Sequence, residues 1–250
     1  MIIKTFNPVF FGLFIIFGLF TLCLKLCLKR ADERQRQLFV AFFYTAILVY
    51  FFVYKYQLSK DVEYSGIQAL SGAGNFSWWT ELPLNLCNIS LVVIPLAFFF
   101  KKRTLMSFGF FVSPLGALLA LLMPVAGFSG YSFFTPRVCG FYFTHYAIFF
   151  SLPIVLSLKL YKPEKRDIMP CFAVFMIIAS VVFVINVLIR VLGFSQFSNY
   201  FYEMSPVNNP VLGFLYNLIP VPGLYLLPVM VGVLIPYMYL ITLILGKYTK

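Results

Sequence analysis

Residues 168–189 read IMPCFAVFMIIASVVFVINVLI and contain no charged side chain. A helix needs about 20 mostly apolar residues to cross a hydrocarbon core roughly 30 Å thick, and this stretch is long enough. Backbone N–H and C=O groups cannot stay unpaired in lipid, so an apolar stretch of this length must be helical. We therefore take residues 168–191 as a membrane-spanning helix.

The composition of the whole chain agrees with this interpretation. Of its 250 residues, 62% are hydrophobic, 20% aromatic and 11% charged, and the mean hydropathy is +0.93. A soluble domain carries about 25% charged residues. A protein core cannot absorb so much apolar surface, so we expect lipid to face much of it. Residues 1–250 are thus expected to form a single polytopic transmembrane domain.

Six further apolar stretches are long enough to cross a bilayer, which predicts an all-α membrane bundle of about seven helices. The first, Pro8–Leu28, is too long for a typical signal-peptide core, so we expect it to remain as a span. Internal prolines predict kinks in several of the helices. The expected spans lie near residues 7–28, 37–57, 83–100, 105–125, 141–160, 168–191 and 222–245.

The formal charge of +11 is distributed unevenly between the two sides of this arrangement. One side collects fourteen basic residues, namely Lys25, Lys29, Arg30, Arg34, Arg36, Lys101, Lys102, Arg103, Lys159, Lys162, Lys165, Arg166, Lys247 and Lys250, and the other has five. Cytoplasmic loops are enriched in Lys and Arg, so we expect the N-terminus outside and the C-terminus in the cytoplasm of a multi-pass plasma-membrane protein. The charge therefore does not indicate a nucleic-acid partner.

Two side chains in the expected outer half of the bilayer are candidates for chemistry. Cys87 lies near the start of the third span, and His145, the only histidine, is expected one turn into the fifth. A thiol and an imidazole at the same depth can act as nucleophile and base in attack on an ester. The alternatives are simple packing, a hydrogen-bonding role for the histidine, or a disulfide between Cys87 and Cys139. These residues supply too few ligands for a metal site.

Other polar groups on this side suggest binding of a lipid headgroup. Asn186 and Arg190 are four residues apart on one face of the sixth span, and Arg137 precedes the fifth. Arginine suits phosphate because its planar guanidinium bonds two oxygens, and the alternative, favoured for at least one of these residues, is snorkelling to the interface. Asn85, Asn88 and Asn199 are candidates to bond an oxyanion or to position an ester.

The segment Leu82-Pro83-Leu84-Asn85-Leu86-Cys87 resembles the Leu-Pro-Leu-His-Leu-Cys segment of the YwaF-like bacterial membrane proteins, which are related to the animal transmembrane protein 164 family. His145-Tyr146 and the stretch Asn199-Tyr200-Phe201-Tyr202 through Pro206 also resemble that pattern. The resemblance implies a phospholipid-remodelling acyltransferase with Cys87 and His145 in the catalytic roles, and it adds Tyr200 to the substrate-positioning residues. Asn85 stands where many relatives have a histidine. If that histidine shares in the proton transfer, this chain is expected to be slower, altered in substrate or inactive.

We therefore expect a phospholipid transacylase that transfers acyl chains between a phospholipid and a lysophospholipid without any cofactor. Acyl-CoA is cytoplasmic, so an outer site would take its acyl group from another lipid. The substrate-positioning set is Asn85, Asn88, Asn199, Tyr200 and Arg190. The alternative function is a binding or transport protein, such as the substrate-capturing subunit of a vitamin importer, in which Cys87 and His145 line a pocket.

Overall fold

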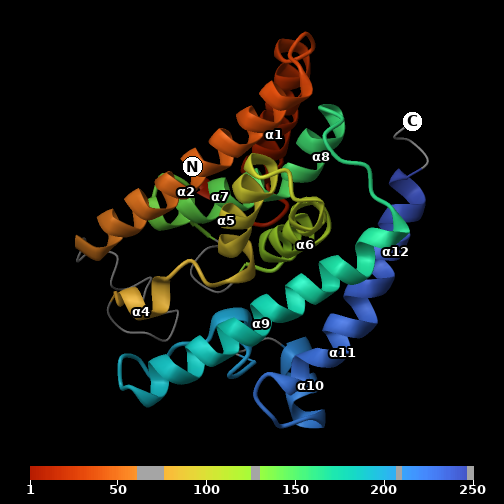
Figure 1. Cartoon of the computed structure of the whole chain (residues 1–250). Helices are drawn as coiled ribbons and strands as arrows, with labels where there is room; N and C mark the ends of the chain where they lie inside the picture. The colour runs from red at the N-terminus through yellow and green to blue at the C-terminus, as the bar shows by residue number, and fades with distance from the viewer. Residues whose placement is uncertain (61–75, 125–129, 207–209, 247–250) are drawn as a thin grey trace.

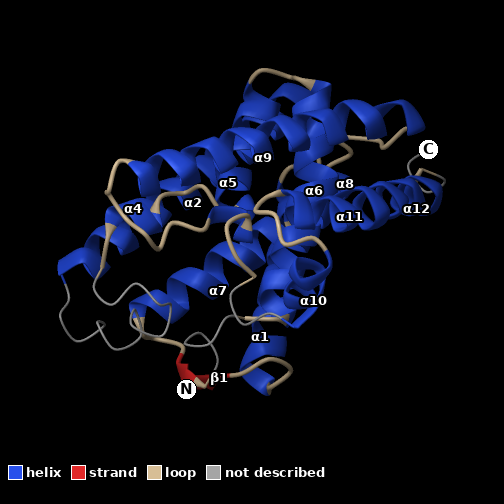
Figure 2. Ribbon diagram, turned by 90° about the horizontal axis from the view of Figure 1, so that it is seen from below, coloured by secondary structure: helices blue, strands red, loops and turns tan. Residues whose placement is uncertain are grey.

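A computed structural model describes residues 1–60, 76–124, 130–206 and 210–246. The regular secondary structure in this part of the chain is helical apart from two short strands (Figures 1 and 2). Parts of the three connections that are expected on the outer side, together with Lys247 and Lys250 from the basic set, lie outside the described residues. The expectation of an all-α membrane bundle is confirmed.

The described helices follow one another along the chain. The α-helices are α1 Pro8–Cys27, α2 Glu33–Lys60, α4 Trp78–Glu81, α5 Leu86–Phe99, α6 Arg103–Leu122, α7 Pro136–Phe149, α8 Ser151–Ser157, α9 Ile168–Val191, α10 Pro210–Leu218, α11 Leu227–Val229 and α12 Ile235–Leu245. Single turns of 3-10 helix are η1 Lys165–Asp167, η2 Tyr200–Tyr202 and η3 Leu224–Leu226, and η4 Met230–Leu234 is π-helical. Two short strands, β1 Ile2–Ile3 and β2 Tyr131–Ser132, pair antiparallel.

Six helical segments in the described residues are long and apolar enough to cross a membrane, and they match six of the expected spans: Pro8–Cys27, Glu33–Lys60, Arg103–Leu122, Pro136–Ser157, Lys165–Val191 and Leu224–Leu245. The seventh, α5, has 14 residues and a length of about 21 Å, which is less than the hydrocarbon thickness. The number of seven spans therefore stays a prediction.

Three expected helix starts are wrong by several residues, and proline explains two of them. The second helix begins at Glu33 rather than at residue 37. The third helix begins at Leu86 rather than at residue 83, because Pro83 holds Leu82 in an extended conformation and Asn85 takes the N-cap position. The fifth begins at Pro136 rather than at residue 141. Proline suits the first helical position, where its fixed φ is already helical and its missing N–H has no partner to lose.

Helices α2, α5, α6 and α7 form the centre of the bundle. Both α2 and α6 pack against α5 and against α7, while α5 and α7 touch each other over a smaller area. Helix α9 packs against α6 and α12 and crosses outside this centre (Figure 1). Large apolar side chains on α1 and α9, such as Leu19 and Val184, face outward, as expected for surfaces in contact with lipid.

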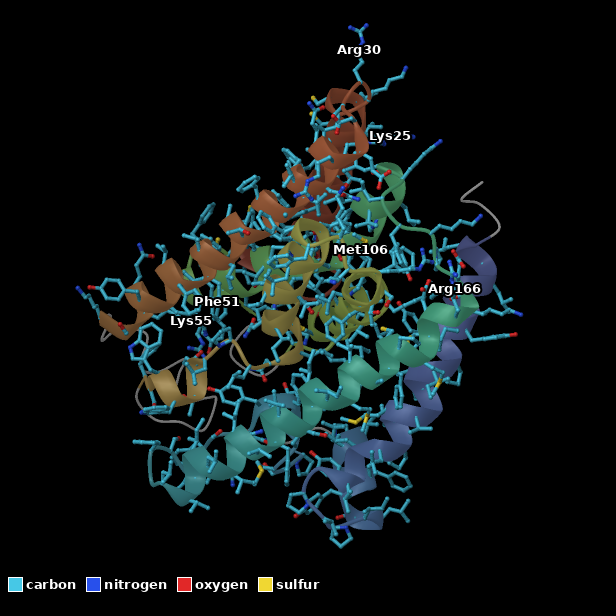
Figure 3. All side chains as sticks on the ribbon, in the orientation of Figure 1. Lys25, Arg30, Phe51, Lys55, Met106 and Arg166 are labelled. Carbon is cyan, nitrogen blue, oxygen red and sulfur yellow. The ribbon has the colours of Figure 1, made fainter. Side chains whose placement is uncertain are left out.

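The connections gather at two opposite ends of the bundle. At one, which we call the basic end, Arg34 at the start of α2 donates to the Phe98 and Phe99 carbonyls at the end of α5. At the other, the site end, β1 pairs with the segment before α7. Figure 3 shows Arg30 and Arg166 toward the basic end and Lys55 at the site end. The assignment of the basic end to the cytoplasm stays a prediction.

Candidate functional site

Cys87 is the second residue of α5, at the site end of the bundle. Its side chain is buried and lies against α6 where that helix has Gly116, since a Cβ built on Gly116 would be 3.6 Å from Sγ. That distance is an ordinary van der Waals contact, whereas the same Cβ would be only 3.1 Å from Leu86 Cδ2, so the missing side chain makes room for Leu86 rather than for the thiol.

The first turn of α5 has no side-chain cap. Asn85 occupies the N-cap position in an extended conformation, but its side chain makes no hydrogen bond to the helix. Its Oδ1 instead accepts from the Phe201 backbone N–H at 3.3 Å. Unpaired N–H groups at a helix start carry partial positive charge and can bond an anion. Cys87 thus lies in a first turn whose N–H groups are not capped by any described side chain.

The η2 turn brings Tyr202 to this helix start. Both Phe201 and Tyr202 have φ of 59°, a left-handed conformation that costs about 1–3 kcal/mol for a bulky residue and persists only when the surroundings enforce it. The Tyr225 hydroxyl donates to the Tyr202 carbonyl. Desolvation, and to a smaller extent the electrostatic influence of Cys87, raises the pKa of the Tyr202 hydroxyl. The phenol therefore lies within electrostatic range of the thiol.

Asn186 holds the η2 turn in place from α9. Its Nδ2 donates to the Tyr200 carbonyl at 3.0 Å and to Glu203 Oε2 at 3.2 Å. Its Oδ1 accepts from the Ser198 hydroxyl at 2.8 Å and from the Tyr200 N–H at 2.9 Å. The side chain is fully buried and all its bonding capacity serves the fold. The prediction that Asn186 offers itself to a headgroup is therefore wrong.

Three of the predicted positioning residues also make hydrogen bonds in or beside this turn. The buried Tyr200 hydroxyl donates to the Trp79 carbonyl at 2.8 Å and accepts from the Leu82 N–H at 3.1 Å, which connects η2 to α4 and its C-cap. The Asn199 amide bonds Met204 and Ser205. Arg190 uses Nε to bond the Ser198 carbonyl at 2.8 Å. Their roles toward a substrate stay predictions.

Asn88 is half-buried in the first turn of α5, and its side chain has no hydrogen-bond partner among the residues that the structure describes. Cys87 and Cys139 are both free thiols, so the alternative of a disulfide between them is wrong for this structure. Cys139 instead accepts a hydrogen bond from the Tyr50 hydroxyl at 3.7 Å.

His145 lies on α7 and is buried. Because α7 begins at Pro136, His145 is nine residues into the helix, and the expectation that it lies one turn in is wrong. Its Nδ1 is 2.7 Å from the Phe141 carbonyl. A carbonyl only accepts, so Nδ1 carries the proton and Nε2 is left as the basic nitrogen.

No hydrogen bond joins Cys87 to His145 in the described part of the chain. The thiol lies against α6 at Gly116, whereas the imidazole lies on Phe141, with ring centroids 4.2 Å apart. The structure thus places the two groups on touching helices but in separate contacts. Their partnership stays a prediction.

A buried cluster of three charges lies at the same end and was missed by the sequence analysis. Glu81 accepts from Lys55 through Oε2 and from Arg137 through Oε1, the second bond being 2.9 Å long. All three side chains are at most 11% exposed. Burial raises the pKa of the Glu81 carboxyl, but the two cations lower it by more, so the net direction is below its ordinary value. The cluster carries a net charge of +1.

Tyr142, three residues before His145 on α7, adds a second unexpected feature. Its hydroxyl is fully buried and has no hydrogen-bond partner among the described residues. Residues three apart share a helix face, so the phenol and the imidazole lie on the same side of α7. A buried hydroxyl without a partner is uncommon and indicates a place where a further polar group can bind.

Comparison with known families gives the relationship of the chain. A profile of the TMEM164 family matches residues 5–242, which is nearly the whole sequence. The chain belongs to the TMEM164 family. No curated protein and no solved structure matches it. Membership of this family and the apolar helices establish a multi-pass membrane protein, and the match covers Cys87, His145 and the η2 turn.

Proposed function

We propose that this TMEM164-family chain is a phospholipid transacylase of the plasma membrane with Cys87 as its nucleophile. The observation that supports this most is the first turn of α5, where no described side chain caps the N–H groups beside the buried thiol. Acyl transfer needs such donors, because negative charge develops on the ester oxygen when the nucleophile attacks. Helix α5 therefore supplies both the nucleophile and the site for the oxyanion.

The reaction has two steps. Cys87 Sγ attacks the ester carbonyl of a donor phospholipid, His145 Nε2 takes the thiol proton, and the ester C–O bond breaks. The departing lysophospholipid oxygen receives that proton, which leaves a thioester on Cys87. The hydroxyl of an acceptor lysophospholipid then attacks the thioester, gives its proton to His145 and displaces the thiolate, which is protonated again. No soluble cofactor enters this sequence.

The proton transfers require Sγ and Nε2 to come within hydrogen-bond distance. Helices α5 and α7 already touch, and the hydrogen bond from Nδ1 to Phe141 presents the imidazole in the basic tautomer. Catalytic contacts are often long without substrate and close when it binds. We therefore expect a bound lipid to bring the two groups together, with the hydroxyls of Tyr142 and Tyr202 available at the same end of the bundle.

The headgroup of the donor lipid needs positive charge at the site end. The cluster of Lys55, Glu81 and Arg137 has one cation in excess, and Arg190 uses only Nε in its bond to Ser198. A lipid phosphate placed near these groups would hold its ester at the level of the α5 start. Asn85, Asn88, Asn199 and Tyr200 would shape the same space.

Transfer in reconstituted vesicles tests the proposal. The vesicles contain a phospholipid with an isotopically labelled acyl chain and an unlabelled lysophospholipid, and mass spectrometry follows the label. We expect transfer by the wild type and by Cys139→Ala, and none by Cys87→Ala. Transfer that persists in Cys87→Ala would overturn the proposal, and so would an inactive wild type that copurifies with an intact small-molecule ligand, as a binding protein would.

A further inference from the structure

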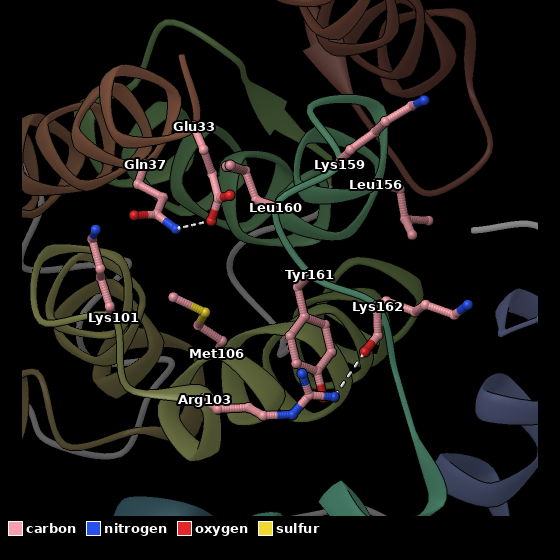
Figure 4. A pocket seen from close by; sticks show the side chains of 10 residues that line it. All are labelled: Glu33, Gln37, Lys101, Arg103, Met106, Leu156, Lys159, Leu160, Tyr161 and Lys162. Atoms are coloured by element: carbon pink, nitrogen blue, oxygen red, sulfur yellow. Dashed lines mark hydrogen bonds between the residues drawn. The ribbon is translucent and has the colours of Figure 1, made fainter. Parts of the chain in front are cut away.

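The basic end of the bundle contains two adjoining cavities that share one residue, Lys159. The larger has a volume of about 470 Å³ and lies between the start of α2, the connection of α5 to α6, and the end of α8 (Figure 4). The smaller, about 310 Å³, lies between the end of α1, the start of α2 and the end of α8. Neither cavity involves Cys87 or His145.

The side chains around these cavities are mostly cationic. Lys101, Lys159 and Lys162 line the larger one with a single carboxylate, Glu33, while Arg103 is already bonded to Asp167 and Glu164. The smaller cavity has no carboxylate in its lining, and three further basic residues join Lys159 there, namely Lys25, Lys29 and Arg36. None of the five lysines makes a salt bridge among the described residues. The cavities therefore attract an anion.

Two of these lysines occupy positions that normally favour glycine. Lys101 has φ of 54° and Lys159 has φ of 55°, each directly after a helix end. The turns are closed by hydrogen bonds from Lys102 N to the Ala97 carbonyl and from Leu160 N to the Val155 carbonyl, both 3.0 Å long. Glycine forms such turns at lower cost. Lysine at these two positions is therefore not explained by the turns themselves, and both residues line the larger cavity.

A buried acceptor in the lining of the larger cavity gives a second, independent indication of a ligand. Gln37 is 3% exposed and donates through Nε2 to Glu33 at 2.9 Å. Its Oε1 has no hydrogen-bond partner among the described residues. The general excess of basic residues at a cytoplasmic surface explains the lysines alone, but it does not explain an unpaired amide oxygen buried beside them.

We infer that the two cavities bind a phosphate ester, with the lysines on its phosphate oxygens and Gln37 Oε1 on a hydroxyl or ammonium group of the same molecule. Lysine binds phosphate as a point charge with three donors. The ester is either the headgroup of an anionic phospholipid at this membrane surface or a soluble phosphate ester. This site is separate from the acyl-transfer site and does not rest on it.

The test compares two variants that lose the same charge. Lys101→Gly/Lys159→Gly removes two cavity lysines and leaves residues that suit both turns, so it is expected to fold. Lys102→Gln/Lys165→Gln removes two exposed lysines of the same end that line neither cavity. Gln37→Leu removes the unpaired acceptor. Each protein is purified in detergent and monitored by thermal unfolding and by native mass spectrometry.

Two probes distinguish the two sources of phosphate. Glycerol 3-phosphate is titrated as the soluble ester, and mixed micelles with phosphatidylglycerol or phosphatidylcholine present the lipid form. We expect one of the two anionic probes to stabilise the wild type and the Lys102→Gln/Lys165→Gln control. Loss of the two charged contacts is expected to weaken binding about tenfold or more in Lys101→Gly/Lys159→Gly. Equal weakening in both double variants, or no binding of either probe by the wild type, would overturn the inference.

Discussion

The charge cluster of Lys55, Glu81 and Arg137 gives the strongest stability prediction. Substitution of Glu81→Gln removes the carboxylate that lies between two buried cations, so the cluster changes from a net charge of +1 to +2. Breaking a buried ion pair by removing one partner costs about 3–5 kcal/mol, because the remaining charge is left uncompensated. Two cations remain here, so we expect a loss in the unfolding free energy of about that size.

Glu164 provides a matched control, because it also contacts two cations. It lies 2.9 Å from Arg103 and 2.8 Å from Arg166, but its side chain is 40% exposed. Exposed ion pairs contribute at most about 1 kcal/mol. Glu164→Gln should therefore stay within about 1 kcal/mol of the wild type. The double variant Lys55→Met/Glu81→Gln, whose remaining cluster charge is again +1, should recover part of the loss.

Denaturant titration in detergent measures these differences. The two tryptophans of the chain, Trp78 and Trp79, lie in α4 beside Glu81, so their fluorescence reports directly on this region. An unfolding free energy for Glu81→Gln equal to that of Glu164→Gln would refute the reasoning. It would mean that water reaches the cluster and screens its charges.

Three further predictions concern pH, packing and the η2 turn. Burial raises the pKa of the Glu203 carboxyl from 4.5 to about 8, although its hydrogen bond to Asn186 acts in the opposite direction. The folded protein therefore favours the neutral carboxyl. The stabilisation of the fold that results is complete below pH 4.5 and is lost as the pH rises to 8. Glu203→Gln should flatten the fall in melting temperature between pH 5 and 8, and an unchanged slope would contradict this. A Cβ on Gly140 would lie 2.8 Å from the Tyr54 ring, so Gly140→Ala should lower the unfolding free energy by about 1–3 kcal/mol. Gly12 has open space around it, so Gly12→Ala should not lower it. Equal melting temperatures of the two variants would contradict this prediction. Asn186→Leu should expose the turn to proteolysis, since its four hydrogen bonds are lost, and an unaltered cleavage pattern would argue against its anchoring role.

The sequence predicts the helices well because lipid imposes one simple requirement. A stretch of about 20 apolar residues has to be helical, and residues 168–191 match α9 to the residue. Helix starts are less predictable, since a single proline moves them, as Pro83 and Pro136 show.

Contacts between distant residues could not be predicted from spacing. Glu81 is 26 residues from Lys55 and 56 from Arg137, so no local period connects them. One signal was present: Lys55 lies within the expected second span, and a charge inside a span needs a partner. Whether Cys87 and His145 are in contact depends on how the helices are arranged around the bundle. The sequence predicts only how deep each residue lies in the membrane, and depth does not determine that arrangement.

The most direct test of acyl transfer is the detection of its covalent intermediate. Purified protein is incubated with a donor phospholipid and no acceptor, quenched in acid, digested and analysed by mass spectrometry. The proposed mechanism predicts one acyl chain on the peptide that contains Cys87, less of it in His145→Ala, and an unchanged amount in Cys139→Ala. Absence of any acyl adduct, or equal acylation of several cysteines regardless of His145, would contradict it.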